Sequence, residues 1–274
     1  MGRTLFIVEG DVYEPSVLKY LWPKLVPEYA NAEFIYTYRT NIYHLYKTLK
    51  KDPDLSLIGL LKERDPKLLP PDADEDTYQE IFLIFDYDGH VNMPQNPPGS
   101  GNHLDGDIIL AELLNYFNDE YDHGRLFLNY PMVEAIRHLT TDPVNPSDLI
   151  TAKCKGPRCP NTDCADRATC PPVRVYKGIA NQAAPNRSDM TILPQAEWKA
   201  IFGHHLCVGS LLSSMLSPGR TDIAMPPEIF KSQHTHFISR DCPQVAVLSA
   251  FPLLFHYYLG AHLPVRLNNL PDPE

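Results

Sequence analysis

Acidic residues follow two apolar segments of the 274-residue chain, in positions where they could bind a metal ion. Glu9 comes directly after the run TLFIV and directly before Gly10, and Asp86 and Asp88 follow IFLIF in the segment IFDYDGH. Two aspartates separated by one residue can both reach a small hard cation from a loop, and Mg²⁺ prefers such oxygen ligands. The alternative interpretation is a polar loop after a strand, but the repetition of the pattern at Glu9 favours a metal site.

Hydrophobic patterns predict the elements that would position these carboxylates. Buried strands are predicted at 4–8, 32–39, 81–90 and 124–131. Apolar residues at helical spacing predict helices at 14–26, 41–51 and 105–120, a short helix is expected within 52–80, and another from Met132. The predicted buried faces of the three longer helices are Val17, Leu18, Leu21, Trp22; Ile42, Leu45, Tyr46, Leu49; and Ile108, Leu110, Leu113, Leu114, Phe117.

This alternation of strands and helices predicts an α/β fold with a mostly parallel sheet flanked by helices. Residues 1–140 are expected to form the core, 141–190 a Cys-rich insertion, and 191–274 a helical C-terminal region. Ligands of parallel sheets bind outside the carboxyl ends of the strands. The acidic residues that follow the first and third strands are therefore expected to converge at one edge.

The pattern strand–Glu–Gly followed by strand–Asp–x–Asp resembles the Toprim superfamily, which has a Rossmann-like fold. IVEGDVYEPSVLKYL is similar to the start of the RloB-like Toprim proteins, and FLNYPMVEAIRHL is similar to a later segment of that family. The resemblance covers roughly residues 4–140. The matching positions are Glu9, Gly10, Glu14, Pro15, Leu18 or Leu21, Asn129, Pro131, Glu134 and His138.

The resemblance implies Mg²⁺-dependent (or Mn²⁺-dependent) cleavage of DNA or RNA, including tRNA, in prokaryotic antiphage defence. A partner ATPase or another protein of the defence system commonly accompanies such nucleases. In this interpretation Asp86 and Asp88 hold Mg²⁺, and Glu9 is a ligand or a general acid/base. Glu14 and Glu134 could complete a second metal position, although the helix dipole favours acidic residues in a first turn in any case.

A phosphoryl-transfer site also requires a cation near the charge that develops in the transition state. Lys177, which follows an alternating stretch in VRVYKG, is the candidate, because OLD-type Toprim nucleases resemble it in using a late lysine. Arg174 is a second candidate. The alternative is an ordinary solvated lysine.

The segment CKGPRCPNTDCADRATC places Cys154, Cys159, Cys164 and Cys170 within 17 residues. Four thiolates are the ligand set of structural Zn²⁺, and an iron–sulfur cluster would use the same ligands. Scattered free thiols remain the alternative, but a metal would explain how a Pro-rich segment folds. The segment is also basic and could bind nucleic acid or a partner through Lys153, Lys155, Arg158 and Arg167.

The composition restricts the remaining possibilities. A net charge of −10 argues against a protein that coats duplex DNA, so a nuclease would need a partner or a local basic patch for substrate capture. No apolar stretch long enough to span a membrane and no signal peptide are found, which predicts a cytoplasmic protein. Two other functions fit the same acidic residues: a catalytically degenerate Toprim assembly subunit of a defence complex, or a metal-dependent nucleotidyl or phosphoryl transferase.

Overall fold

A computed structural model of the chain describes residues 3–29, 33–52, 55–87, 93–94, 103–104, 106–140, 142–153, 176–184, 187, 189–240 and 243–273. The chain divides into two compact units. Unit 1 comprises Met1–Phe85 with Asn92–Phe127, and unit 2 comprises Asp86–Val91 with Leu128–Glu274. Among the described residues, no helix has the length and apolar character needed to cross a membrane.

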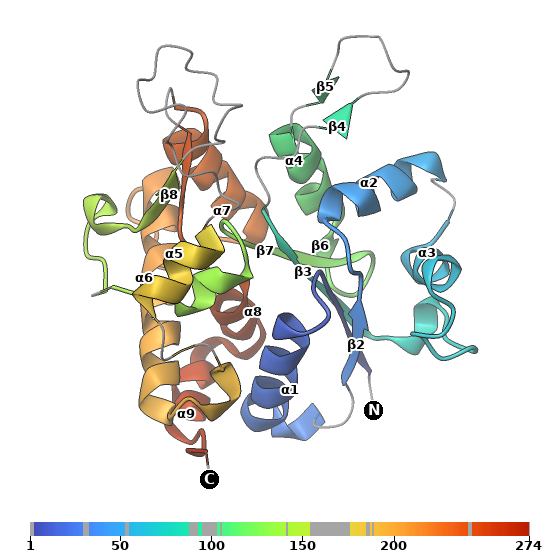
Figure 1. Cartoon of the computed structure of the whole chain (residues 1–274), viewed down its shortest axis with the longest axis horizontal. Coiled ribbons are helices and arrows are strands. Elements are labelled where there is room, and N and C mark those ends of the chain that lie inside the picture. The colour runs from blue at the N-terminus through green and yellow to red at the C-terminus, as the bar shows by residue number, and fades with distance from the viewer. Residues whose placement is uncertain are drawn as a thin grey trace. The chain divides into compact units, whose positions relative to one another are not determined.

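In the described part of the chain, the main sheet has five strands in the order β2-β1-β3-β7-β6 (Figure 1). β1 (Thr4–Val8) lies between β2 (Glu33–Thr37) and β3 (Glu80–Asp86) and pairs with both in parallel. β7 (Gly124–Asn129) pairs on its far side with the short antiparallel β6 (Asn118–Asp119). The predicted α/β class and the predicted strands at 4–8, 32–39 and 124–131 are confirmed to within two residues. The strand predicted at 81–90 ends at Asp86, residues 88–90 lie outside the described residues, and β6 was not predicted.

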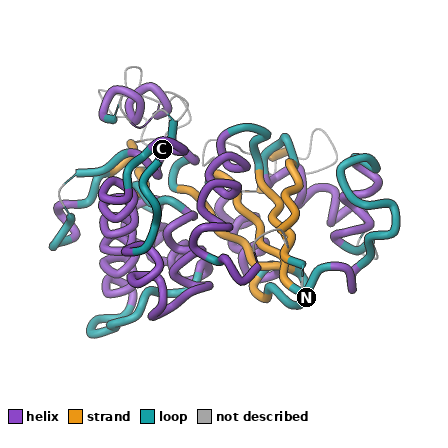
Figure 2. The backbone as a smooth tube through the Cα atoms, turned by 90° about the horizontal axis from the view of Figure 1, so that it is seen from below, coloured by secondary structure: helices purple, strands orange, loops and turns teal. Residues whose placement is uncertain are grey.

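Four α-helices accompany these strands in the described residues of unit 1. Two of them begin at a residue whose side chain caps the helix: Asn41 accepts a hydrogen bond from the backbone N–H of His44, and Ser56 from that of Gly59. The helices are α1 (Tyr13–Leu25), α2 (Ile42–Lys51), α3 (Leu57–Arg64) and α4 (Gly106–Tyr116). The strands of the main sheet lie side by side (Figure 2). Two further strands of two residues each, β4 (Met93–Pro94) and β5 (His103–Leu104), pair with each other in antiparallel orientation.

The helix faces follow the predicted periodicity, except at three residues of α4 and α2. The predicted face of α1 is fully buried, and so are the predicted residues of α4 apart from Ile108, which is 52% exposed. Successive helical residues are rotated by about 100°, so Ile108 lies away from the side that Leu110, Leu113 and Leu114 present to the core. In α2, Tyr46 and Leu49 are only half-buried.

Unit 2 is mainly helical (Figure 2), as predicted for the C-terminal region. A short strand pair was not predicted: β8 (Thr151–Lys153) runs antiparallel to β9 (Gln244–Ala246). The short helix expected from Met132 is a 3₁₀ turn, η3 (Val133–Arg137). The α-helices described in this unit are α5 (Tyr176–Ala183), α6 (Gln195–Leu216), α7 (Pro226–Gln233), α8 (Ala250–Leu259) and α9 (Leu263–Asn268).

The core of unit 1 depends on Phe6 in β1. Its fully buried ring packs edge-on against Trp22 of α1, with ring centroids 4.7 Å apart, and stacks on Phe82 of β3 at 5.8 Å. We expect Phe6→Ala to lower the free energy of unfolding by about 3–5 kcal/mol, because it removes both contacts and leaves a cavity.

Urea denaturation followed by far-UV circular dichroism measures this loss. Val12→Ala is the matched control, since Val12 is 72% exposed and its truncation should change stability by less than about 0.5 kcal/mol. Equal effects of the two substitutions would contradict the assignment of Phe6 to the core.

Candidate functional site

Glu9 occupies a defined position just past the carboxyl end of β1. Its backbone N–H donates to the carbonyl of Ile84 in β3 at 3.1 Å, and its carbonyl accepts from the N–H of Arg39 at 2.8 Å. These bonds continue the pairing of β1 with both neighbouring strands beyond Val8, so the backbone of Glu9 is fixed at the edge of the sheet. Its side chain is half-buried.

Glu14 lies in the first turn of α1 and is 4% exposed. Its Oε1 accepts a hydrogen bond from the backbone N–H of Gly10 at 3.1 Å, which closes the loop between β1 and α1. A Cβ at position 10 would lie only 2.6 Å from Glu14 Oε2, so a side chain there would have to displace the Glu14 carboxylate. Glu14 thus has a structural role in this loop, and its role as a metal ligand stays a prediction.

Asp86 is the last residue of β3 and is held by Asn129 within unit 2. The Asn129 amide nitrogen donates to Asp86 Oδ1 at 3.2 Å, while the backbone N–H of Tyr87 donates to the Asn129 carbonyl at 2.9 Å. Asn129 is fully buried, and its Oδ1 accepts from the N–H of Ala250 at 2.9 Å and the hydroxyl of Ser249 at 3.5 Å, at the start of α8. The second aspartate of the motif, Asp88, lies outside the described residues.

Glu134 and Lys177, which were predicted separately, form an ion pair in unit 2. Lys177 Nζ lies 3.1 Å from Glu134 Oε1, and Arg137 Nη2 lies 3.9 Å from the same oxygen. Glu134 is buried in η3, whereas the Lys177 side chain is 68% exposed. Lys177 lies in the first turn of α5, and the alternating residues 173–175 that precede this helix lie outside the described residues.

Two further side chains near this ion pair, Tyr176 and His138, were not predicted to be functional from their residue type. The buried Tyr176 hydroxyl hydrogen-bonds His138 Nδ1 at 2.9 Å. Burial, reinforced by the charge of Glu134, raises the pKa of Tyr176, and burial lowers the pKa of His138. Both side chains are therefore neutral at pH 7, next to the charged Glu134. In the sequence, the only sign of a role for Tyr176 is that it directly precedes Lys177.

The paired histidines of α6 are buried. His205 Nε2 donates to the carbonyl of Ile136 at 3.3 Å, and its Nδ1 accepts from the N–H of Ser249 at 3.3 Å, which defines a neutral ring. Burial lowers the pKa of His205 to about 3. His204 is 1% exposed, and neither of its ring nitrogens hydrogen-bonds another described residue. Within the described ranges, no three His, Cys, Asp or Glu side chains gather as a metal site.

The predicted zinc cluster lies outside the described residues. This holds for Cys154, Cys159, Cys164 and Cys170 and also for the neighbouring Lys155, Arg158, Arg167 and Arg174. Lys153 ends β8, where its backbone is paired with that of Gln244 in β9. The metal and nucleic-acid roles of this segment stay predictions.

Comparisons with family models, with curated proteins and with solved structures give no match for this chain. The Toprim resemblance therefore rests on the sequence motifs.

Asn129 is expected to be essential for the stability of unit 2. Asn129→Ala leaves the buried N–H of Ala250 and the carboxylate of Asp86 without their shared partner. We expect a loss of about 1–3 kcal/mol in the free energy of unfolding, measured by urea denaturation. Asn268→Ala, at an exposed position, is the control. A loss no larger than that of the control would show that Asn129 does not carry these contacts.

The buried His205 predicts a dependence of stability on pH. Its folded pKa of about 3 lies below the ordinary value of 6.5, so the unfolded chain binds the proton first as the pH falls. The stability associated with neutral His205 is present above pH 6.5 and is lost as the pH falls toward 3, by up to about 1.4 kcal/mol per pH unit.

Urea midpoints measured between pH 7.5 and pH 4 test this dependence. His205→Gln should reduce the slope of stability against pH, whereas His262→Gln, at an exposed position, should leave it unchanged. A slope that is the same in wild type and His205→Gln would contradict the prediction.

Proposed function

We propose that the chain is a metal-dependent nuclease of the Toprim type, which hydrolyses phosphodiester bonds of DNA or RNA. One observation carries this proposal. Asp86 ends β3, and the buried amide of Asn129, in the same unit, orients its carboxylate. Parallel strands present their carboxyl ends at one edge of a sheet, where ligands of such folds bind.

The residues at this edge suit a hard divalent cation. Asp86 supplies carboxylate oxygens, Asp88 follows two residues later, and the sequence motif adds Glu9; Mg²⁺ or Mn²⁺ prefers such ligands. A bound ion would supply charge stabilisation at the phosphoryl oxygens and a more acidic water. These three residues are the proposed ligands, and Glu14 and Glu134 are candidates for a second position.

The other residues have roles that need no metal. Asn129 is a positioning residue, because it fixes the orientation of the Asp86 carboxylate. Lys177 is the proposed cation for the phosphate, and its exposed side chain is accessible to a large substrate. Glu134 would hold Lys177 in place until the phosphate competes for it.

We propose the biological setting from the sequence resemblance alone. The protein would act in the cytoplasm as an effector of prokaryotic antiphage defence, together with an ATPase or another protein of the system. The Cys-rich segment would bind Zn²⁺ and contribute its basic residues to substrate or partner binding.

A second candidate function is a non-catalytic assembly subunit. Two of the predicted acidic ligands already have partners within the chain, since Glu14 accepts from Gly10 and Glu134 pairs with Lys177. A site that no longer binds a metal would still keep such contacts, because they stabilise the fold. A nucleotidyl or phosphoryl transferase would use the same carboxylates and differs only in its substrate.

The decisive experiment is a cleavage assay on DNA, RNA and tRNA with Mg²⁺ or Mn²⁺. We expect Asp86→Asn to reduce the rate on the order of 100-fold or more, since the proposed ligand loses its charge. Asp122→Asn, at an exposed position, is the matched control. Cleavage by Asp86→Asn at the wild-type rate would contradict the proposal, and assays with nucleotides would detect a transferase.

Lys177→Met should lower the same rate by about 100-fold, because removing one group that stabilises transition-state charge typically has that effect. Lys231→Met, an exposed lysine at the end of α7, should cleave at the wild-type rate. Equal rates for the two variants would exclude Lys177 from the reaction.

A further inference from the structure

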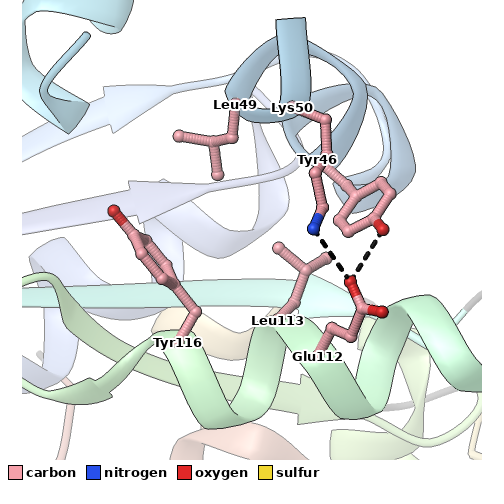
Figure 3. Close-up of a pocket in the computed structure, with 6 residues that line it drawn as sticks. All are labelled: Tyr46, Leu49, Lys50, Glu112, Leu113 and Tyr116. Carbon is pink, nitrogen blue, oxygen red and sulfur yellow. Dashed lines mark hydrogen bonds and ion pairs between the residues drawn. The ribbon is translucent and has the colours of Figure 1, made fainter. Parts of the chain in front are cut away.

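A pocket of about 350 Å³ lies between α2 and α4 of unit 1 (Figure 3). This volume falls within the range of about 300–1,000 Å³ that is typical of small-molecule sites. The pocket takes no part in the proposed metal site. Its lining residues are Tyr46, Leu49 and Lys50 of α2, and Glu112, Leu113 and Tyr116 of α4.

The pocket has an apolar floor between two aromatic residues. Leu49 and Leu113 lie between Tyr116 on one side and Tyr46 on the other (Figure 3). Tyr116 is 47% exposed, and its ring is supported by edge contacts with Phe117 at 4.9 Å and His123 at 4.4 Å between centroids. A flat ring could therefore cover the leucines and contact a tyrosine face.

One end of the pocket is polar and ordered by hydrogen bonds. Glu112 Oε2 accepts from the Tyr46 hydroxyl at 2.7 Å and lies 3.3 Å from Lys50 Nζ (Figure 3). The Tyr46 hydrogen bond and the Lys50 contacts lower the pKa of Glu112, so it is ionised at neutral pH. A carboxylate has about four acceptor positions, and the contacts of Glu112 with Tyr46 and Lys50 both involve Oε2. Oε1 can accept an N–H from a ligand.

One lysine, Lys50, lines the pocket and pairs there with Glu112, and further lysines lie on the same helix. Residues 34–51 contain no Asp or Glu, although the chain carries a net charge of −10. The basic residues of this stretch are Arg39, Lys47, Lys50 and Lys51, and the three lysines are exposed on the last two turns of α2. The exposed side of α2 beside the pocket therefore carries positive charge, which can attract the phosphates of a ligand that extends beyond the pocket.

We infer that this pocket binds a base of single-stranded nucleic acid, with the adjoining phosphates near the lysines of α2. The inference rests on the proposed function and names the substrate form that the nuclease would hold. Base–aromatic stacking combined with a positively charged rim is the usual basis of single-strand binding. Glu112 Oε1 would accept an N–H, and every base offers at least one, so binding is tolerant of sequence.

A duplex does not fit this geometry, because its bases are stacked and paired within the helix and cannot enter a pocket singly. An apolar peptide side chain could fill the floor, but it would make no use of the lysines of α2. A single strand uses the aromatic walls, the acceptor and the positive charge together.

Fluorescence anisotropy with a labelled mixed-sequence 12-mer, RNA or DNA, tests the inference in EDTA, where cleavage does not interfere. Tyr116→Ala and Tyr46→Ala should each weaken binding about tenfold, which matches the loss of one stacked base. Tyr116→Phe should bind like wild type because it keeps the ring. Tyr121→Ala removes a 71% exposed tyrosine outside the pocket and is the control.

Two further probes define the ligand. A fully abasic 12-mer should bind about tenfold more weakly than the normal strand, and AMP should compete only weakly. Wild-type binding by both alanine variants with retained fold, or equal binding of the abasic strand, would overturn the inference. AMP binding as tight as that of the 12-mer would overturn the single strand in favour of a free nucleotide.

The result is separable from the nuclease proposal. Base-dependent binding in EDTA that is lost in Tyr116→Ala supports the pocket even if no cleavage occurs with Mg²⁺. Cleavage with wild-type binding by both alanine variants supports the nuclease and overturns the pocket.

Discussion

The hydrogen bonds of one fully buried amide organise the proposed site. Asn129 donates to Asp86 and accepts from the N–H of Ala250, 121 residues further along the chain. A buried amide must satisfy its polar atoms, so it fixes both partners at once. The orientation of Asp86 at the end of β3 therefore depends on how α8 begins, and the start of α8 is also where Ser249 contacts the neutral His205.

Charge is distributed unevenly, and this distribution links the two proposed sites. Carboxylates follow β1 and β3, whereas α2 presents lysines in a stretch without acidic residues. A carboxylate site for a cation repels a polyanion until a metal is bound. The lysines on the exposed side of α2, beside the pocket of unit 1, would give the proposed nuclease a local attraction for its substrate that its net charge does not provide.

The sequence predicts an element well where every apolar residue of its pattern is also buried in the structure. The runs at 5–8 and 81–85 are apolar without interruption, and their parallel pairing follows from the helix between successive strands. Ile108 was misassigned because the neighbouring apolar residues of IILAELL (108–114) do not show which of them faces inward. β6 has two residues and β9 has three, which are too few to show the alternation of apolar and polar residues that predicts a strand. Asn129 was noticed only as a motif position, since its partners are distant in sequence, and Tyr46 was expected to pack the core although it lines a pocket.

Binding of Mn²⁺, followed by the loss of its free electron paramagnetic resonance signal, tests the central claim most directly, because it requires no substrate. The account predicts that the wild-type protein binds Mn²⁺, that Mg²⁺ displaces it, and that Asp86→Asn weakens this binding at least tenfold while Asp122→Asn does not. Equal Mn²⁺ binding by wild type and Asp86→Asn, with both folded, would contradict the assignment of Asp86 as a metal ligand.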